Sequence, residues 1–219
     1  SRVYNYAIKM EHTHQNPWAK IERYSTPQRK VVWQHSDVIR FLDKAYSDYE
    51  YRNVGLIVQM AYEWCQRLGD MRTLQWENID LATRVLTLEQ SKRRADVSLP
   101  ISDELVTMLN EQRKDFGFQE YVVPHPNPTM GKYEPYAMER LSKVGRRVMR
   151  LAGLPEELRL MDLRRTGVTQ MIDSGVPMGQ LMSVTGHNNV SSVKPYMKHT
   201  YDSANNALTQ RNIRVQSST

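Results

Sequence analysis

The pattern of apolar and polar positions divides this 219-residue chain near residue 35. Residues 1–15 place apolar side chains three and four positions apart, which predicts a short helix. Residues 16–35 contain two prolines and several cations without periodicity, which is typical of a linker. We therefore expect a domain boundary in this linker, a domain over 36–201, and a polar tail over 202–219 with a short helical stretch.

The predicted domain is mainly helical. Apolar residues recur at helical spacing over 36–47 and 51–66, and Ser36 is suited to cap the first of these helices. Residues 84–90 and 95–101 alternate apolar and polar side chains on either side of a cationic turn, which is typical of a β-hairpin. Further elements are expected as a third strand at 120–125 and as helices at 103–114, 136–151, 162–174 and 178–184. The predicted fold class is therefore mainly α with a small antiparallel β-sheet (α+β).

Composition narrows the environment and the partners. With 40% hydrophobic residues the chain can bury a core, and its single cysteine, Cys65, allows neither an internal disulfide nor a Cys-rich zinc site. No apolar run is long enough to span a membrane, and the N-terminal residues lack a signal-peptide pattern, so we expect a cytoplasmic protein. A net charge of +6 favours a polyanionic partner such as nucleic acid.

One predicted helix, within 136–154, adds a candidate DNA-binding surface. Its apolar residues form one stripe, made of Leu141, Val144, Val148 and Leu151. Cations form a second stripe beside it, made of Arg140, Lys143, Arg147 and Arg150. A cationic face next to a buried one suits a phosphate backbone, because each neutralised phosphate releases counterions. A solvated surface helix is the other interpretation of this pattern.

Two arginines far apart in the sequence stand where a guanidinium can be oriented toward an anion. Arg67 follows a predicted helix and precedes Asp70 by three residues, so the carboxylate can orient it. Arg164 lies near the start of a predicted helix, whose N-terminal N–H groups favour anions. Together the two arginines can grip one phosphate through bidentate hydrogen bonds. The alternative is an ordinary ion pair for each, Arg164 with Asp162 or Glu157.

Other candidates for chemistry lie in the hairpin turn and near the end of the chain. Lys92 is placed to supply a proton, and its neighbours Arg93 and Arg94 are candidate DNA-binding residues. Either arginine could enter the site instead of Lys92. His187 follows a glycine at a predicted turn, and Tyr196 comes nine residues later. A tyrosine hydroxyl is a nucleophile once it loses its proton. Tyr196 has a competitor for this role in the nearby Tyr201.

In order and spacing, these residues resemble the catalytic domain of the tyrosine recombinases, the phage integrase family, over about residues 16–199. The family's motifs fall, in chain order, on Arg67 with Asp70, Lys92, Arg164, His187 and Tyr196. Met161 stands where the family has a histidine, and a thioether neither donates a strong hydrogen bond nor shuttles protons. The tyrosine proton would then pass to His187 or to the phosphate itself.

The resemblance implies a site-specific DNA recombinase or integrase that cleaves and rejoins DNA through a 3′-phosphotyrosyl intermediate. The resemblance further implies that this reaction needs no metal or other cofactor. In this reaction Arg67, Arg164 and His187 would stabilise the charge on the phosphate. Lys92 would protonate the departing 5′-oxygen, and Tyr196 would attack the phosphorus.

The resemblance also implies partners and domain roles. The substrate would be double-stranded DNA, bound by a homotetramer, with accessory DNA-bending proteins as optional partners. Residues 1–15 would end an N-terminal core-binding domain, and the tail over 202–219 would dock on a neighbouring protomer or pack in cis. Two other functions stay open: a catalytically silent DNA-binding module, which Met161 would suit, and a type IB topoisomerase.

Overall fold

The computed structural model describes residues 2–19, 29–92, 94–197 and 201–216. The chain divides into two compact units, Ser1–Lys30 and Val31–Thr219. In the first unit, helix α1 (Arg2–Lys9) buries none of its residues, and Asn16 donates a hydrogen bond back to Asn5 at 2.8 Å. The assignment of this segment to a preceding DNA-binding domain stays a prediction.

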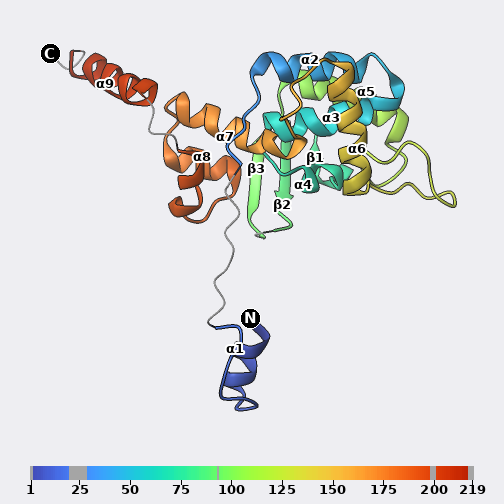
Figure 1. Ribbon diagram of the computed structural model, residues 1–219. Coiled ribbons are helices and arrows are strands. Elements are labelled where there is room, and N and C mark those ends of the chain that lie inside the picture. The colour runs from blue at the N-terminus through green and yellow to red at the C-terminus, as the bar shows by residue number, and fades with distance from the viewer. Residues whose placement is uncertain (1, 20–28, 93, 198–200, 217–219) are drawn as a thin grey trace. The chain divides into compact units, whose positions relative to one another are not determined.

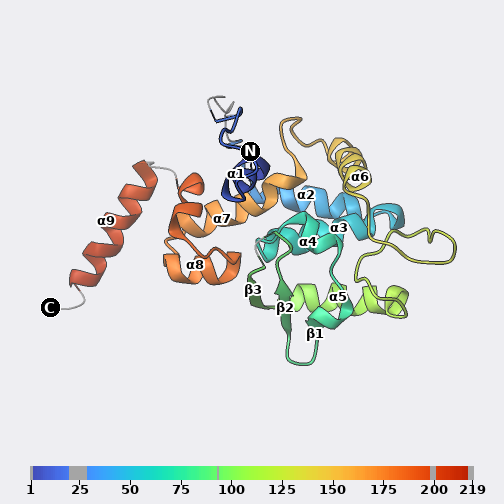
Figure 2. The same cartoon turned by 90° about the horizontal axis from the view of Figure 1, so that it is seen from below.

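The second unit combines helices with one small sheet (Figures 1 and 2). The α-helices are α2 (His35–Tyr46), α3 (Tyr49–Glu63), α4 (Leu68–Arg72), α5 (Asp103–Phe116), α6 (Met138–Leu151), α7 (Leu163–Asp173), α8 (Met178–Thr185) and α9 (Tyr201–Gln216). The 3₁₀ helices are η1 (Trp76–Asn78), η2 (Leu160–Asp162), η3 (Val190–Ser192) and η4 (Lys194–Tyr196). The strands are β1 (Ile79–Asp80), β2 (Val85–Glu89) and β3 (Asp96–Pro100). In the described part of the chain, no helix is long and apolar enough to cross a bilayer.

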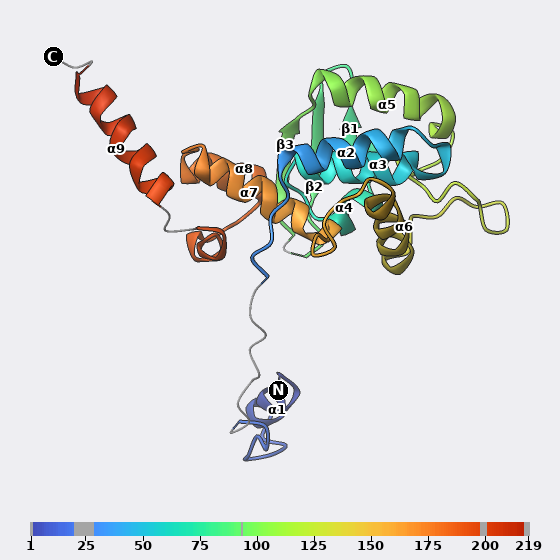
Figure 3. The ribbon, with the colours of Figure 1, turned by 45° about the horizontal axis from the view of Figure 1, so that its top comes forward.

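Helix α3 is the central element, because it contacts α2, α4, α6 and α7 (Figure 3). It is buried on nearly all sides from Val54 to Ala61, which explains why its sequence is apolar without a polar face. Asp48 caps its first turn through the side chain. Gly55 allows α2 to lie close, since a Cβ at this position would be 2.9 Å from the Cβ of Ala45.

The sheet is antiparallel, in the order β1-β2-β3. Leu86 pairs with Leu99 and Leu88 with Val97, and all four side chains are buried. Residues between them point to solvent, as the alternation in the sequence predicted. The predicted hairpin and the predicted fold class are thus confirmed.

The third strand predicted at 120–125 is wrong. In this segment Tyr121 and Pro124 make only isolated bridges, to Gln75 and Pro135. Proline has no N–H to donate, so two prolines opposite one another cannot extend a ladder. The third strand is β1 instead, which at two residues is too short to show an alternating pattern.

Helix α6 is rotated from the orientation that its sequence predicted. Leu141 and Val148 are buried as expected, but Leu151 is 52% exposed, and Gly145 and Met149 are buried in its place. The predicted apolar residues do not all stay on one side of the helix, because successive residues turn by about 100° around its axis. The cationic stripe therefore lies opposite the core rather than beside it.

A second, smaller apolar cluster lies apart from the main core. Val168 of α7, Leu181 of α8 and Val193 pack together with Cys65, and Tyr196 is partly buried against them. Gly167 makes room for this packing, because a Cβ there would lie 2.3 Å from the Cys65 sulfur. The segment from α7 to η4 thus shares a small core with the turn between α3 and α4.

Candidate active site

Arg67 directly precedes α4, after the turn that ends α3. That turn depends on Cys65, whose φ of 52° lies in the left-handed region that favours glycine. The Arg67 Nη1 donates to Gln90 Oε1 at 2.9 Å and lies 3.6 Å from Asp70 Oδ2. The other oxygen of Asp70 accepts hydrogen bonds from the backbone and the hydroxyl of Ser91 in the hairpin turn. The arginine and the hairpin are thus tied to one buried carboxylate.

Arg164 projects from the first turn of α7 and is only 8% exposed. Its Nη2 donates to the backbone oxygen of Thr185 at 2.6 Å, and its Nη1 donates to Gln66 Oε1 at 3.4 Å. Burial, and next the positive charge of Arg67, lower the pKa of Arg164 to about 10. Both arginines line one cavity of about 250 Å³. Two guanidinium groups on one cavity form a suitable site for an anion such as phosphate.

His187 follows the end of α8 and is 4% exposed. The helix ends at Gly186, which has a φ of 64°. The hydroxyl of Thr185 donates to the backbone oxygen of Leu181 at 2.8 Å, and His187 Nδ1 lies 2.6 Å from the same hydroxyl oxygen. Because a hydroxyl has one proton, the hydrogen-bond network assigns the donor role in the second contact to Nδ1–H. The neutral ring then carries its lone pair at Nε2.

Tyr196 ends η4, and the side chains of His187 and Arg165 both lie near its ring. Its ring centroid is 6.0 Å from that of His187, with an edge-on angle of 60°. The guanidinium carbon of Arg165 lies 4.9 Å from the ring centroid, and Arg165 Nη1 donates to the backbone oxygen of Pro195 at 3.2 Å. The tyrosine is only partly buried, so its ring is held without being sealed in the interior.

The predicted hairpin cations fall in the turn between β2 and β3. Lys92 and Arg94 are both exposed, and Arg94 has a φ of 49°. Arg93 lies outside the described residues. The turn is connected to the arginine cavity through Gln90 and Ser91. Lys92 is therefore on the hairpin that contacts Arg67 and Asp70 of the site.

Met161 forms part of the cavity wall and is 71% exposed. Leu68, Met138 and Leu160 line the same cavity. Met161, which stands where the predicted motif has a histidine, thus presents an apolar side chain to the cavity that Arg67 also lines. The cavity has a cationic side and an apolar side.

The predicted cationic stripe of α6 stands away from this cavity. Arg140, Lys143, Arg147 and Arg150 are all exposed. Arg147 lies 3.8 Å from Glu50 and stacks at 5.6 Å over the ring of Tyr51. The stripe is exposed, as a phosphate-binding surface must be, but one of its members already has a partner on α3.

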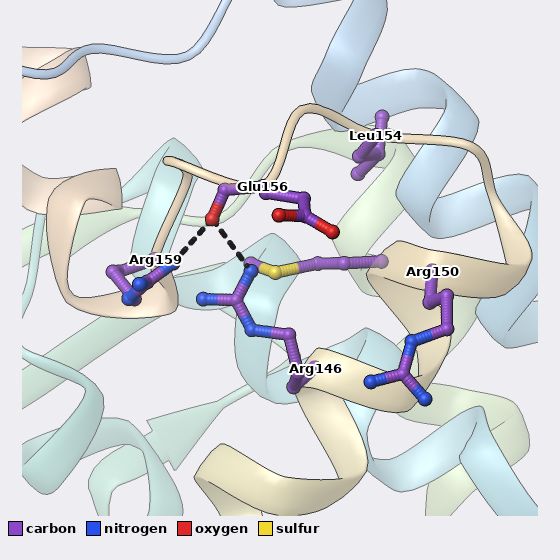
Figure 4. Close-up of a pocket in the computed structure, with 6 residues that line it drawn as sticks. Arg146, Arg150, Leu154, Glu156 and Arg159 are labelled. Atoms are coloured by element: carbon purple, nitrogen blue, oxygen red, sulfur yellow. Dashed lines mark hydrogen bonds between the residues drawn. The ribbon is translucent and has the colours of Figure 1, made fainter.

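Figure 4 shows a second cavity, of about 330 Å³, beside the other end of α6. Arg146 and Arg159 both point into it and donate to the backbone oxygen of Glu156. These two arginines hold the loop that leads into η2, which explains their place in the sequence without a ligand. Arg150 lines the same cavity.

Sequence reasoning missed several side chains of the site. Gln66, Gln90, Thr185 and Arg165 contact the predicted residues directly. Gln66 and Arg165 each stand next to a predicted arginine in the sequence. That position was the only sequence signal that could have pointed to them. No group of three or more His, Cys, Asp or Glu side chains suited to a metal occurs among the described residues.

Comparison with known proteins decides the family. The profile of the phage integrase family matches residues 33–203, which is most of the chain. The chain belongs to the phage integrase family. This membership confirms the predicted resemblance, and it favours an integrase-type DNA recombinase over a silent DNA-binding module or a topoisomerase.

Individual members of the phage integrase family are distant in sequence. An integrase/recombinase of Sinorhizobium fredii, y4gC, is 26% identical over 148 residues, covering 65% of this chain and 74% of that protein. The integrase of Salmonella phage P22 is 23% identical over 146 residues, covering 64% of this chain and 38% of the phage protein. A lambda integrase tetramer bound to a Holliday junction has a TM-score of 0.67 and 18% identity, with 90% of this chain and 56% of that chain covered. The last comparison shows the shared fold.

Proposed function

We propose that this integrase cleaves and rejoins DNA through a covalent 3′-phosphotyrosyl intermediate, with Tyr196 as the nucleophile. The observation that carries the proposal is that Arg67 and Arg164 line one cavity, while His187, beside Tyr196, adjoins the Thr185 turn that Arg164 also contacts. These side chains come from four separate elements. A phosphate in the cavity would meet two guanidinium groups whose positions are already fixed.

The reaction follows from these positions. The Tyr196 oxygen attacks the phosphorus, a bond from tyrosine to phosphorus forms, and the bond from phosphorus to the 5′-oxygen breaks. Arg67 and Arg164 would stabilise the extra charge on the nonbridging oxygens, and losing one such donor costs about 10²–10³ in rate. Lys92 would give a proton to the 5′-oxygen. Attack by the 5′-hydroxyl of another strand reverses these steps and rejoins the DNA.

The tyrosine proton has two possible acceptors. Met161 supplies no lone pair basic enough to take it. His187 protonated at Nδ1 carries its lone pair at Nε2, so the neutral ring could accept the proton. A nonbridging phosphate oxygen is the other acceptor. His187 that has gained a proton could then donate to the phosphate, which would add to the stabilisation by the two arginines.

The family relatives suggest the partners. The lambda integrase in the solved structure is a tetramer bound to a Holliday junction. We propose double-stranded DNA as the substrate of this chain and a homotetramer as the active assembly, with accessory DNA-bending proteins where the DNA must be looped. The cytoplasm, where such DNA is accessible, would be the site of action. The tail over 202–219 would complete the tetramer in trans or pack in cis.

The test is adduct formation on nicked duplex DNA taken from the sequence that flanks the gene. The nick lets the cleaved 5′-end diffuse away, so the covalent protein–DNA adduct accumulates and is seen as a shifted band on a denaturing gel. We expect the adduct with the wild-type chain and with Tyr201→Phe, and its loss with Tyr196→Phe. An adduct that persists in Tyr196→Phe would move the nucleophile to another residue.

A further inference from the structure

Two buried glutamines lie between the catalytic candidates. Gln66 ends the turn before Arg67, and Gln90 follows β2 on the hairpin. Both side chains are 0% exposed. A buried amide is costly unless its donors and acceptors are satisfied, so the partners of these two groups show what they hold in place.

The amide of Gln66 uses its full capacity. Its Nε2 donates to the backbone oxygens of Trp64 at 2.8 Å and Val184 at 2.7 Å. Its Oε1 accepts from Gln90 Nε2 at 2.6 Å and from Arg164 Nη1 at 3.4 Å. The side chain thus links the end of α3 to the end of α8 and presents an oxygen to Arg164.

The amide of Gln90 continues the same chain of hydrogen bonds. Its Nε2 donates to Gln66 Oε1 at 2.6 Å and to the backbone oxygen of Thr185 at 3.0 Å. Its Oε1 accepts from Arg67 Nη1 at 2.9 Å. If either amide were flipped, an NH₂ group would face a guanidinium N–H, so the orientation of both is determined.

We propose that Gln66 and Gln90 form a positioning pair, which sets the distance and orientation of Arg67 and Arg164 and fastens both to the hairpin that carries Lys92. The inference rests on the proposed function, because the arginines are there the groups that bind the scissile phosphate. Neither glutamine is required to touch DNA. Each acts through the arginine that its Oε1 accepts from.

Neutral amides suit this task better than carboxylates. A carboxylate would orient an arginine as well, but it would also cancel the positive charge that the phosphate needs. Asp70 already supplies one negative charge at 3.6 Å from Arg67. With glutamines at 66 and 90, the cavity keeps an excess of positive charge. The lowered pKa of Arg164, caused by burial and by Arg67, is consistent with two cations held close together.

Space around the pair is also reserved for it. A Cβ at Gly186 would lie 2.9 Å from the amide carbon, nitrogen and oxygen of Gln90. The glycine that turns the chain toward His187 therefore also leaves room for the Gln90 amide. The pair thus contacts the side chains of Arg67 and Arg164 and the turn that leads to His187.

The first experiment uses the near-isosteric variants Gln66→Leu and Gln90→Leu in the full chain. We expect each to slow adduct formation on nicked DNA by about 10²-fold, because a misplaced catalytic group costs about that much. Noncovalent DNA binding should stay within a few-fold of wild type. The matched control is Gln112→Leu, which removes a 2% exposed amide bonded to Asn53 and to the Val122 backbone, away from the site. The control should lower the thermal midpoint without changing the cleavage rate of the folded protein.

A double-mutant cycle separates positioning from general stability. If Gln90 acts through Arg67, then Gln90→Leu should add little to the loss already caused by Arg67→Ala. Losses that multiply, or Leu variants that cleave as fast as Gln112→Leu, would overturn the positioning role. If the wild-type chain forms no adduct at all, the proposed function fails.

A measurement without DNA tests the pair in that case too. Nitrogen-15 NMR of the arginine side chains reports whether rotation of a guanidinium group is restricted by hydrogen bonds. We expect restricted signals for Arg67 and Arg164 in the wild type and in Gln112→Leu, and an averaged signal for Arg67 in Gln90→Leu. Arg164 should rotate more freely in Gln66→Leu than in the wild type, although its bond to the backbone oxygen of Thr185 remains. Unchanged signals in the Leu variants would refute the inference, whatever the protein does to DNA.

Discussion

Arg165 covers one face of the Tyr196 ring and also holds the backbone of the preceding residue. Its guanidinium carbon is 4.9 Å from the ring centroid, and its Nη1 donates to the oxygen of Pro195. A cation over an aromatic face contributes about 0.5–2 kcal/mol, depending on its hydration. The neighbour of Arg164 thus restricts the orientation of the proposed nucleophile.

Arg165→Ala should therefore slow adduct formation by about 2- to 30-fold, which is the rate equivalent of that contact energy. Arg165→Lys, which keeps a charge without the planar group, should recover part of the loss. Single-turnover cleavage of nicked DNA measures the effect. The control is Arg113→Ala, which removes a similar stack on Trp76 at 5.6 Å. Equal rates for both alanine variants would show that Arg165 does not position the tyrosine.

The pKa of Cys65 makes the stability of the fold depend on pH in a predictable direction. Burial raises the pKa of its thiol to about 11, and the charge of Arg164 opposes this only in part. At pH 8 about one thiol in a thousand is then ionised. Because the folded pKa lies above the ordinary value of about 8.5, the thiol of the unfolded chain ionises first as the pH rises. The contribution of Cys65 to the free energy of unfolding is therefore fully present below about pH 8.5 and is lost as the pH rises toward 11.

We expect Cys65 in the native chain to react with iodoacetamide at pH 8 at least about 100-fold more slowly than in urea-unfolded chain, since reaction needs the exposed thiolate. Mass spectrometry after timed quenching measures both rates. Similar rates in the two states would mean that the turn between α3 and α4 opens readily.

At the scale of elements, the end of α8 combines two demands on one residue. Gly186 has a left-handed φ of 64°, and the Gln90 amide fills the space where a Cβ would be. Gly153, after α6, has a similar φ of 62° but nothing within 4 Å of a Cβ. Alanine substitutions at the two glycines therefore separate the cost of backbone strain from the effect of displacing Gln90.

Gly153→Ala should lower the free energy of unfolding by about 1–2 kcal/mol, the cost of a left-handed residue with a side chain, and Gly186→Ala should lower it by at least as much. Gly186→Ala should in addition slow adduct formation, because it pushes Gln90 away from Arg67. Urea unfolding and the cleavage assay measure the two effects. A Gly153→Ala variant with an equally large cleavage defect would contradict this explanation.

At the scale of the molecule, the exposed cations of α6 face away from the core. We propose that Arg140 and Lys143 contact DNA phosphates, since both are exposed on that face. Replacing both by alanine should weaken DNA binding and make the slope of log K against log salt shallower by about 0.9 for each lost phosphate contact. Fluorescence anisotropy at several salt concentrations gives the slope. Lys114→Ala, an exposed lysine on α5 paired with Glu111, should leave the slope unchanged.

Much of this fold could be predicted because its helices are long and most have clear ends. The pattern failed for short or irregular pieces. Helix α4 has five residues, fewer than two turns, so it shows no periodicity. The segment around Tyr121 has the β-branched composition of a strand but lies in a loop that is held by isolated bridges. Apolar content alone does not decide pairing.

The site could be predicted only where single residues carry recognisable chemistry in a family order. Arg67, Arg164, His187 and Tyr196 were found in that way, and their catalytic roles stay predictions. The pairing of Gln66 with Gln90, 24 residues apart, leaves no local pattern, because an amide can serve as a surface residue or as a buried connector. The partners of a buried polar group are visible only after folding.

The separate apolar cluster of α7 and α8 has a consequence for how the enzyme loses activity. Tyr196 rests on this cluster of Val168, Leu181 and Val193, which has far fewer members than the main core. Regions with little buried apolar surface open at a lower free energy than the whole molecule. In mild denaturant we expect Tyr196 to detach from this cluster before the main core melts, so that adduct formation is lost first.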